Sequence, residues 1–146
     1  MTSHVDTDAP LRLALVDDDP SVRRAIGRLL KSLGFGVDLY SSAYAFLSQP
    51  RSQWPDCAIV DVRMPGQTGI ALVDTLRAIA ARVPVILITG DADTSLAERA
   101  GTCGAVALLS KPIDAWLLAE TLKRVAAGRL RRDDAALLPQ GESDFQ

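Results

Sequence analysis

The chain has 146 residues, with 16 Lys and Arg against 18 Asp and Glu, a net charge of −2 and an apolar fraction of 48%. This length suits one domain with its own core, and a slightly acidic chain offers no basic field for phosphates, so direct binding of nucleic acid is not expected. The sequence lacks both an apolar run of the ~20 residues that span a bilayer and the basic-then-apolar order of a signal peptide, which predicts a cytoplasmic protein without membrane contact.

Short apolar runs alternate with longer segments of helical periodicity along most of the chain. This alternation is typical of βα units, in which helices cover both faces of a buried parallel sheet. In chain order we predict strands over residues 11–16, 36–40, 57–60, 84–89 and 105–109, and helices over residues 20–33, 42–49, 69–81, 93–102 and 114–127. The predicted fold class is therefore α/β, a doubly wound (βα)5 domain around a five-stranded parallel sheet.

Residues at the ends of these segments support the assignment. Pro20 suits the first turn of a helix that follows an Asp N-cap, and Asp114 can cap the last helix. We expect residues 10–128 to form the domain and residues 1–9 to be a flexible N-terminus. Residues 129–146 mix charge with Pro and Gly and are predicted to be a C-terminal tail or linker with no output domain.

Charged and hydroxyl side chains follow or end four of the predicted strands. Asp17 and Asp18 follow the first strand, Asp61 follows the third and Lys111 the fifth, while Thr89 ends the fourth. Ligands of open α/β sheets collect beyond the carboxyl ends of the strands, so these side chains are expected to face one crevice. Each alone has an ordinary role as a helix cap, a strand end or a surface charge. Their shared placement indicates a functional site.

The chemistry of such a crevice follows from its charge. Two unit charges about 4 Å apart repel by roughly 4 kcal/mol at a dielectric of about 20, so clustered carboxylates favour a bound cation. Carboxylate oxygens are hard ligands suited to Mg²⁺, with Mn²⁺ as the alternative ion. With the cation bound, one carboxylate can attack phosphorus and form an acyl phosphate. Lys111 and the Thr89 hydroxyl would then contact the other phosphoryl oxygens.

Five motifs then identify a family. In order they are "LVDDDPSVRRAI", "AIVDVRMPGQTG", "PVILITG", "AGTCGA" and "LLSKPID". Together they resemble the response regulator receiver domain, the CheY-like fold of two-component signalling, over about residues 10–128. This resemblance implies a flavodoxin/CheY-like sheet with strand order 2-1-3-4-5.

The resemblance also implies roles for the residues of the crevice. Asp61 would accept a phosphoryl group from the phosphohistidine of a sensor histidine kinase or a phosphotransfer protein. Thr89 and Lys111 would contact that group, and the bond between Lys111 and Pro112 would be cis. The ligands of Mg²⁺ would be Asp17, Asp18, Asp61 and the backbone carbonyl of Arg63.

A receiver is a signalling domain rather than an enzyme, with only self-phosphorylation and self-dephosphorylation chemistry. Phosphorylation would change the face formed by residues 93–102, 105–109 and 114–127, and so control contacts with a downstream protein or a second copy of the chain. The motifs are closest to the FixJ-like branch, whose members usually carry a DNA-binding domain after the receiver. The chain is either a stand-alone receiver, which we favour, or a fragment of a longer regulator.

Two positions on this face depart from the common receiver pattern. Receivers usually place an aromatic residue three positions before the lysine, and this chain has Leu108 there, which removes the ring that normally carries the readout. Trp116 is expected to point away from the core, because the apolar stripe of the last helix runs through Leu118, Leu122 and Val125. Trp116 either covers the end of the sheet or belongs to an apolar patch used for dimerisation or target binding.

Two other classes of protein share parts of this pattern. A haloacid dehalogenase-like phosphatase would use Asp17 as nucleophile and Asp19 as general acid, but it would leave Asp61 without a role. A flavodoxin-like cofactor binder would need a Gly- or Ser/Thr-rich phosphate loop after the first strand, which the sequence lacks. The two cysteines, Cys57 and Cys103, are expected to be reduced structural thiols.

Overall fold

The computed structural model describes residues 11–79, 81–90, 98–99 and 102–128. Its five strands are all parallel and form one sheet in the order β2-β1-β3-β4-β5, which confirms the predicted strand order. The strands are β1 (Arg12–Val16), β2 (Gly36–Tyr40), β3 (Cys57–Asp61), β4 (Val85–Thr89) and β5 (Ala107–Ser110). The predicted flexible N-terminus and C-terminal tail lie outside the described residues.

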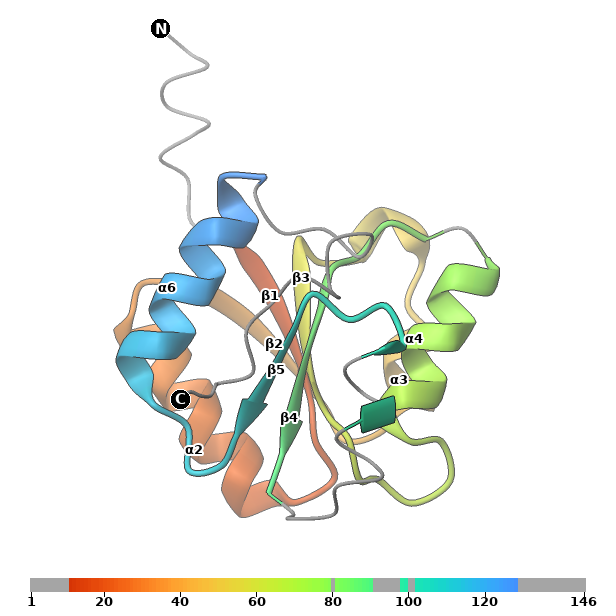
Figure 1. Cartoon of the computed structure of the whole chain (residues 1–146), viewed down its shortest axis with the longest axis horizontal. Helices are drawn as coiled ribbons and strands as arrows, with labels where there is room; N and C mark the ends of the chain where they lie inside the picture. Colours follow the sequence, from red (N-terminus) through yellow and green to blue (C-terminus); the bar gives the residue numbers. More distant parts are fainter. Residues whose placement is uncertain (1–10, 80, 91–97, 100–101, 129–146) are drawn as a thin grey trace, which may run out of the picture.

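Helices cover both faces of the sheet (Figure 1). On one face lie α2 (Pro20–Ser32) and α6 (Ala115–Ala126), and on the other lie α3 (Ala43–Leu47) and α4 (Gly69–Ala78). A short 3-10 turn, η1 (Arg51–Gln53), lies between α3 and β3 and was not predicted. Among the described residues, no helix is long and apolar enough to cross a membrane.

The predicted helix caps are present. Asp19 is the N-cap of α2, and its side chain accepts hydrogen bonds from the backbone N–H groups of Ser21 and Val22. Asp114 caps α6 in the same way by accepting from the N–H of Leu117. Such caps satisfy backbone donors that have no partner inside the helix, and they fix where each helix begins.

Most predicted boundaries agree with the structure to within two residues, and the exception is the end of α4. This helix ends at Ala78 rather than at residue 81. Ala81 and Val83 are nonetheless buried, because the segment after the helix packs into the core. The apolar character of Ala81 therefore resembled a continued helical pattern. Most of the predicted helix over residues 93–102 lies outside the described residues.

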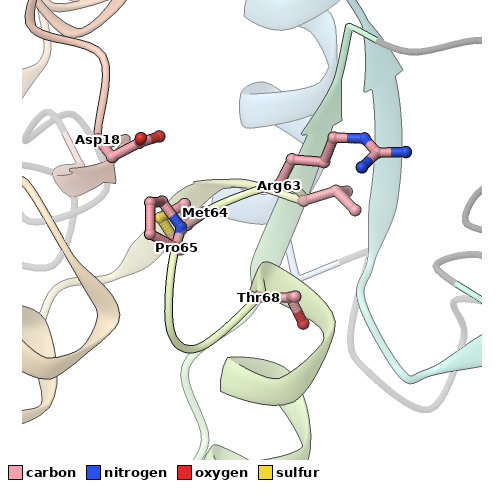
Figure 2. A pocket seen from close by; sticks show the side chains of 6 residues that line it. Asp18, Arg63, Met64, Pro65 and Thr68 are labelled. Carbon is pink, nitrogen blue, oxygen red and sulfur yellow. The ribbon is translucent and has the colours of Figure 1, made fainter.

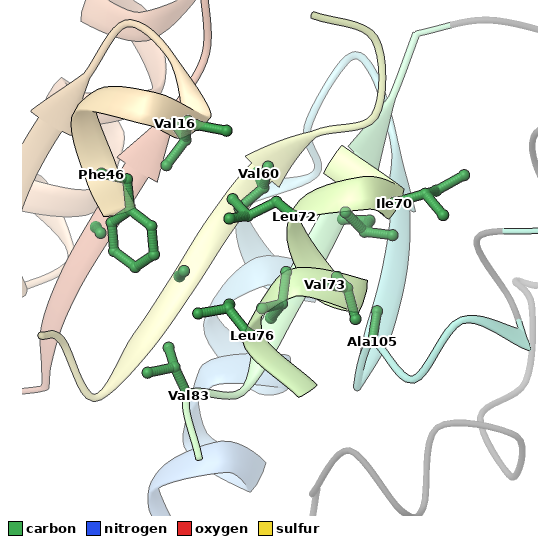
Figure 3. Close-up of a cluster of buried hydrophobic side chains, with 14 of the residues drawn as sticks. Val16, Phe46, Val60, Ile70, Leu72, Val73, Leu76, Val83 and Ala105 are labelled. Carbon is green, nitrogen blue, oxygen red and sulfur yellow. The ribbon is translucent and has the colours of Figure 1, made fainter. Parts of the chain in front are cut away.

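Two layers of apolar side chains hold the helices to the sheet. Between α3, α4 and the sheet, Phe46 is fully buried among residues such as Val16, Val60 and Leu72 (Figure 3). Its ring meets Tyr40 edge-on and stacks on Trp54, with centroids 5.6 and 6.0 Å apart. The other layer joins α2 and α6 to the sheet through Leu13, Leu15, Ile26, Leu30, Ile59, Ile86, Leu118 and Leu122.

Side chains at the two positions that depart from the receiver pattern lie in different environments. Leu108 is half-buried and packs against the core layer of α3 and α4. Trp116 is 70% exposed and its neighbour Leu117 is 43% exposed, which confirms that Trp116 points away from the core. Both cysteines are buried and neither forms a disulfide, as expected for structural thiols.

Candidate functional site

The exit of β1 carries three consecutive aspartates that face different surroundings. Asp17 is almost fully buried, and its backbone N–H donates to the carbonyl of Tyr40 on the neighbouring strand. Its carboxylate accepts from the N–H of Asp19 at 2.9 Å. Asp18 is exposed beside it, and Asp19 is turned toward α2 as the N-cap. The run "DDD" thus divides into a buried carboxylate, an exposed carboxylate and a helix cap.

Asp61 ends β3 next to this turn and is 7% exposed. The N–H of Arg63 donates to its Oδ1 at 3.0 Å, which fixes the carboxylate orientation. The start of α4 lies very close to the same residue, since a Cβ atom at Gly69 would lie 2.5 Å from the backbone oxygen of Asp61. Only glycine permits this approach, because real Cβ contacts do not occur at that distance.

Lys111 lies just beyond β5 and joins two of these carboxylates. Its Nζ is 2.9 Å from Asp61 Oδ2 and 3.6 Å from Asp17 Oδ2. Its aliphatic stem lies over Gly90, where an added Cβ would be 3.1 Å from Lys111 Cδ. The bond to Pro112 is cis, as predicted. The absence of a side chain at residue 90 therefore makes room for the lysine that reaches the acidic cluster.

Thr89 is positioned by the register of the central strands. Asp61 pairs with Ile88, and Thr89 is the next residue of β4. Thr89 is 9% exposed, and its carbonyl accepts from the N–H of Lys111 at 2.8 Å. Strand pairing therefore brings Thr89 to the edge of the sheet that holds Asp61 and Lys111.

Burial and charge shift the protonation equilibria of this cluster. Burial raises the pKa of Asp17, and the nearby charge of Asp61 adds to that rise, against the opposing effects of the Asp19 N–H and Lys111. Burial by itself would lower the pKa of Lys111, but its hydrogen bond to Asp61 and the charges of Asp61 and Asp17 raise it overall. Lys111 is therefore held as an ammonium ion, the counter-charge of two crowded carboxylates.

The cluster has the chemistry of a divalent-cation site. Oxygen atoms of Asp17, Asp18 and Asp61 all lie within 4.8 Å of one another, and among the described residues no other group of three acidic, Cys or His ligands lies so close together. Carboxylates crowded at this distance suit a hard cation that keeps several of its own waters, such as Mg²⁺. The role predicted for the backbone carbonyl of Arg63 stays a prediction.

A hollow of about 440 Å³ adjoins this cluster. In Figure 2, Asp18 lies on one side, Met64 and Pro65 face it, and Thr68 lies at the start of α4. Val62 and Arg63 complete the lining. The hollow lies between the loops that follow β1 and β3, and Asp18 belongs both to it and to the acidic cluster.

Sequence reasoning missed one residue of this site, Arg23 in α2. Its Nη1 donates to the backbone carbonyl oxygen of Asp17 at 2.7 Å. The available signal was its place one turn into a helix that begins directly after the aspartates. Helical side chains lean toward the helix N-terminus, so a long cation there can reach back to the preceding loop.

The fold and the site define a class of protein. The model of the response regulator receiver domain family matches residues 13–123, and the chain belongs to that family. FixJ, a transcriptional regulatory protein of Bradyrhizobium diazoefficiens, is 40% identical over 100 residues, which cover 68% of this chain and 49% of FixJ. Nodulation protein W of the same organism is 33% identical over 144 residues, or 98% of this chain and 63% of that protein.

A solved structure agrees with these relatives. The crystal structure of FixJ-N superposes with a TM-score of 0.74 at 31% identity, covering 80% of this chain and 93% of that one. The chain thus resembles the FixJ-like branch, and it spans about half the length of FixJ itself. The phosphatase alternative receives no support from these comparisons, and its general acid, Asp19, is already engaged in capping α2.

Proposed function

We propose that this chain is the phosphoryl-accepting domain of a two-component pathway and that Asp61 is the acceptor. The observation that carries the proposal is the contact of Lys111 Nζ with Asp61 Oδ2 at 2.9 Å, beside the carboxylates of Asp17 and Asp18. A role as an isolated surface charge would not account for a lysine and two further carboxylates around Asp61. A carboxylate that must receive a phosphoryl group needs both positive charge and a cation site at this position.

The transfer step uses a phosphohistidine on a sensor histidine kinase or a phosphotransfer protein. An oxygen of Asp61 attacks phosphorus, the P–N bond to imidazole breaks, and the imidazole leaves with the electron pair of that bond and takes up a proton. The product is an acyl phosphate on Asp61. The hollow beside Asp18, lined by Met64 and Pro65, lies where the donor would approach.

Asp17, Asp18, Asp61 and the carbonyl of Arg63 would hold Mg²⁺ or Mn²⁺, which when bound neutralises charge on the phosphoryl oxygens. Lys111, now paired with Asp61, would pair with a phosphoryl oxygen once the carboxylate is esterified. The Thr89 hydroxyl would donate to another of these oxygens. These are binding and charge-stabilising roles. The chain itself accepts the phosphoryl group and is not an enzyme that turns over a separate substrate.

The proposed output is a change of protein contacts. Phosphorylation would alter the face that includes residues 105–109 and 114–127, where Trp116 is exposed, together with the helix predicted from the sequence over residues 93–102. This change would control binding to a downstream protein or to a second copy of the chain. Leu108 fills the position of the usual aromatic residue and packs against the core. We also propose residues 10–128 as the domain, a range that contains the matched residues 13–123.

The test is the intact mass of the protein after incubation with MgCl2 and one of two small donors, acetyl phosphate or phosphoramidate, which offers a P–N bond. Asp61→Asn removes the proposed acceptor, and Asp38→Asn is the matched control, an exposed aspartate of the edge strand β2. We expect one phosphoryl group on the parent chain and on Asp38→Asn, and none on Asp61→Asn or with EDTA. A phosphoryl group that persists on Asp61→Asn would assign another acceptor. A parent chain unmodified by both donors would contradict the proposal.

A further inference from the structure

Arg23 makes one contact that the proposed transfer chemistry does not use. Its guanidinium group donates from Nη1 to the carbonyl oxygen of Asp17 at 2.7 Å, a short, charge-assisted hydrogen bond. That oxygen belongs to the peptide group that joins Asp17 to Asp18. The guanidinium therefore restrains the peptide plane between Asp17 and Asp18, two of the proposed metal ligands.

Local structure explains how Arg23 reaches this peptide. Asp19 caps α2, Pro20 begins it, and the N–H of Arg23 closes the first helical turn by donating to the carbonyl of Asp19 at 2.9 Å. From this position a side chain that leans toward the helix N-terminus returns over the loop. The half-buried Arg23 is thus directed at the aspartates, whereas its neighbour Arg24 is exposed to solvent.

We propose that Arg23 is a positioning residue of the cation site. On the other side of the turn, the N–H of Asp17 is held by the Tyr40 carbonyl and its carboxylate by the Asp19 N–H. Arg23 holds the remaining polar group of Asp17, its carbonyl, and so limits rotation of the peptide that sets the direction of Asp18. This inference rests on the proposed function, because it assumes that Asp17 and Asp18 bind a divalent cation.

The two effects of Arg23 on cation binding have opposite signs, which makes the inference testable. Its positive charge repels a divalent cation, so loss of that charge alone would strengthen Mg²⁺ binding. Its hydrogen bond holds the ligands in place, so loss of the bond would weaken Mg²⁺ binding. Loss of a partner that orients metal ligands typically changes metal affinity by about 10- to 100-fold. We therefore expect the loss of positioning to outweigh the loss of charge repulsion.

The experiment is a titration of the folded protein with MgCl2, followed by ¹⁵N NMR. The amide groups of Asp19 and Arg63 donate to the carboxylates of Asp17 and Asp61 and report on both sides of the site. The variants are Arg23→Met and Arg23→Lys, and the control is Arg24→Met, which removes the same charge one residue away. Urea unfolding in EDTA measures the stability of each metal-free variant separately.

We expect Arg23→Met to weaken Mg²⁺ binding by about tenfold, and Arg23→Lys, which keeps the charge and a donor, to recover part of the loss. Arg24→Met should stay within about twofold of the parent chain because an exposed charge is screened by salt. Equal or tighter binding by Arg23→Met would overturn the positioning role while leaving the cation site intact. A parent chain whose Asp19 and Arg63 signals do not respond to MgCl2 would overturn the cation site itself, and the role of Arg23 with it.

Discussion

Replacing Asp17 by Asn should stabilise the metal-free domain. The Asp17 carboxylate is almost fully buried between two other acids, and burial followed by the charge of Asp61 drives its pKa upward. Asn has nearly the same shape, and its side-chain oxygen can still accept the hydrogen bond that Asp19 N–H donates to Asp17 Oδ1. The substitution therefore removes mainly the charge.

The size of the effect follows from the distances in the cluster. At 4.8 Å, the limit within which the carboxylate oxygens of the cluster lie, two like charges repel by about 3.5 kcal/mol if the effective dielectric is about 20. Asp17 has two such neighbours, Asp18 and Asp61. The opposing attraction to Lys111 Nζ at 3.6 Å is about 4.5 kcal/mol on the same scale. Burial of the charge, the largest cause of the raised pKa of Asp17, adds to these repulsions. Together they exceed the attraction, and the free energy of unfolding should rise by roughly 2 kcal/mol in Asp17→Asn.

The assay is urea unfolding at neutral pH with EDTA or with MgCl2. In EDTA the variant should be the more stable protein. With MgCl2 the parent chain should gain stability by mass action, and the variant should gain less, since it has lost one ligand. Asp38→Asn, an exposed aspartate outside the cluster, controls for the general loss of one negative charge.

The pH dependence has a definite sign. A raised pKa means that the folded state of Asp17 binds protons more tightly than the unfolded state, so metal-free stability falls as pH rises from the ordinary value of 3.8 through the raised pKa. The advantage of Asp17→Asn should therefore shrink on acidification and vanish below that range. A variant less stable than the parent chain in EDTA at neutral pH would refute this account of the cluster.

Three further predictions concern the scaffold. Gly69→Ala should lower the free energy of unfolding by about 1–3 kcal/mol, because the added Cβ would meet the backbone oxygen of Asp61. Gly36→Ala, the control with open space around the added Cβ, should be near neutral. Equal effects of the two substitutions on urea unfolding would contradict the close approach at Gly69. Phe46→Ala should cost about 3–5 kcal/mol since the ring is fully buried, and a smaller loss in the same assay would show that the layer collapses around the gap. Burial raises the pKa of Cys57 to about 12, so peptide mapping should find it unmodified by a thiol reagent at mildly alkaline pH until urea is added, and rapid labelling of the folded chain would count against its burial.

Sequence patterns predicted the sheet well because its central strands are buried on both faces. β3 and β4 are buried at every position, so they appear as short uninterrupted apolar runs, which a half-exposed strand or an amphipathic helix does not produce. β5 was placed up to two residues too early, since Ala105 and Val106 are equally apolar but precede the paired residues. Periodicity detects burial and cannot show where strand pairing begins.

The site was predictable to the extent that it sits at strand ends. Asp17, Asp61, Thr89 and Lys111 follow from one rule about the carboxyl edge of a parallel sheet. Arg23 did not follow, because a hydrogen bond to a backbone carbonyl depends on the path of the loop and leaves no mark in residue type. The closeness of Gly69 to Asp61 was hidden for the same reason, as it arises from packing between α4 and β3.

The two tryptophans lie in contrasting surroundings, which gives the chain two separate optical probes. Trp54 stacks on Phe46, donates from Nε1 to the Gln49 carbonyl at 3.0 Å and lies 5.4 Å beneath the Arg51 guanidinium. Trp116 is 70% exposed on α6. The tryptophan emission of a Trp116→Phe chain would come only from the aromatic cluster and would follow unfolding of that layer. The tryptophan emission of a Trp54→Phe chain would come only from the surface of α6, where a docking partner would shield the indole from an aqueous quencher such as iodide.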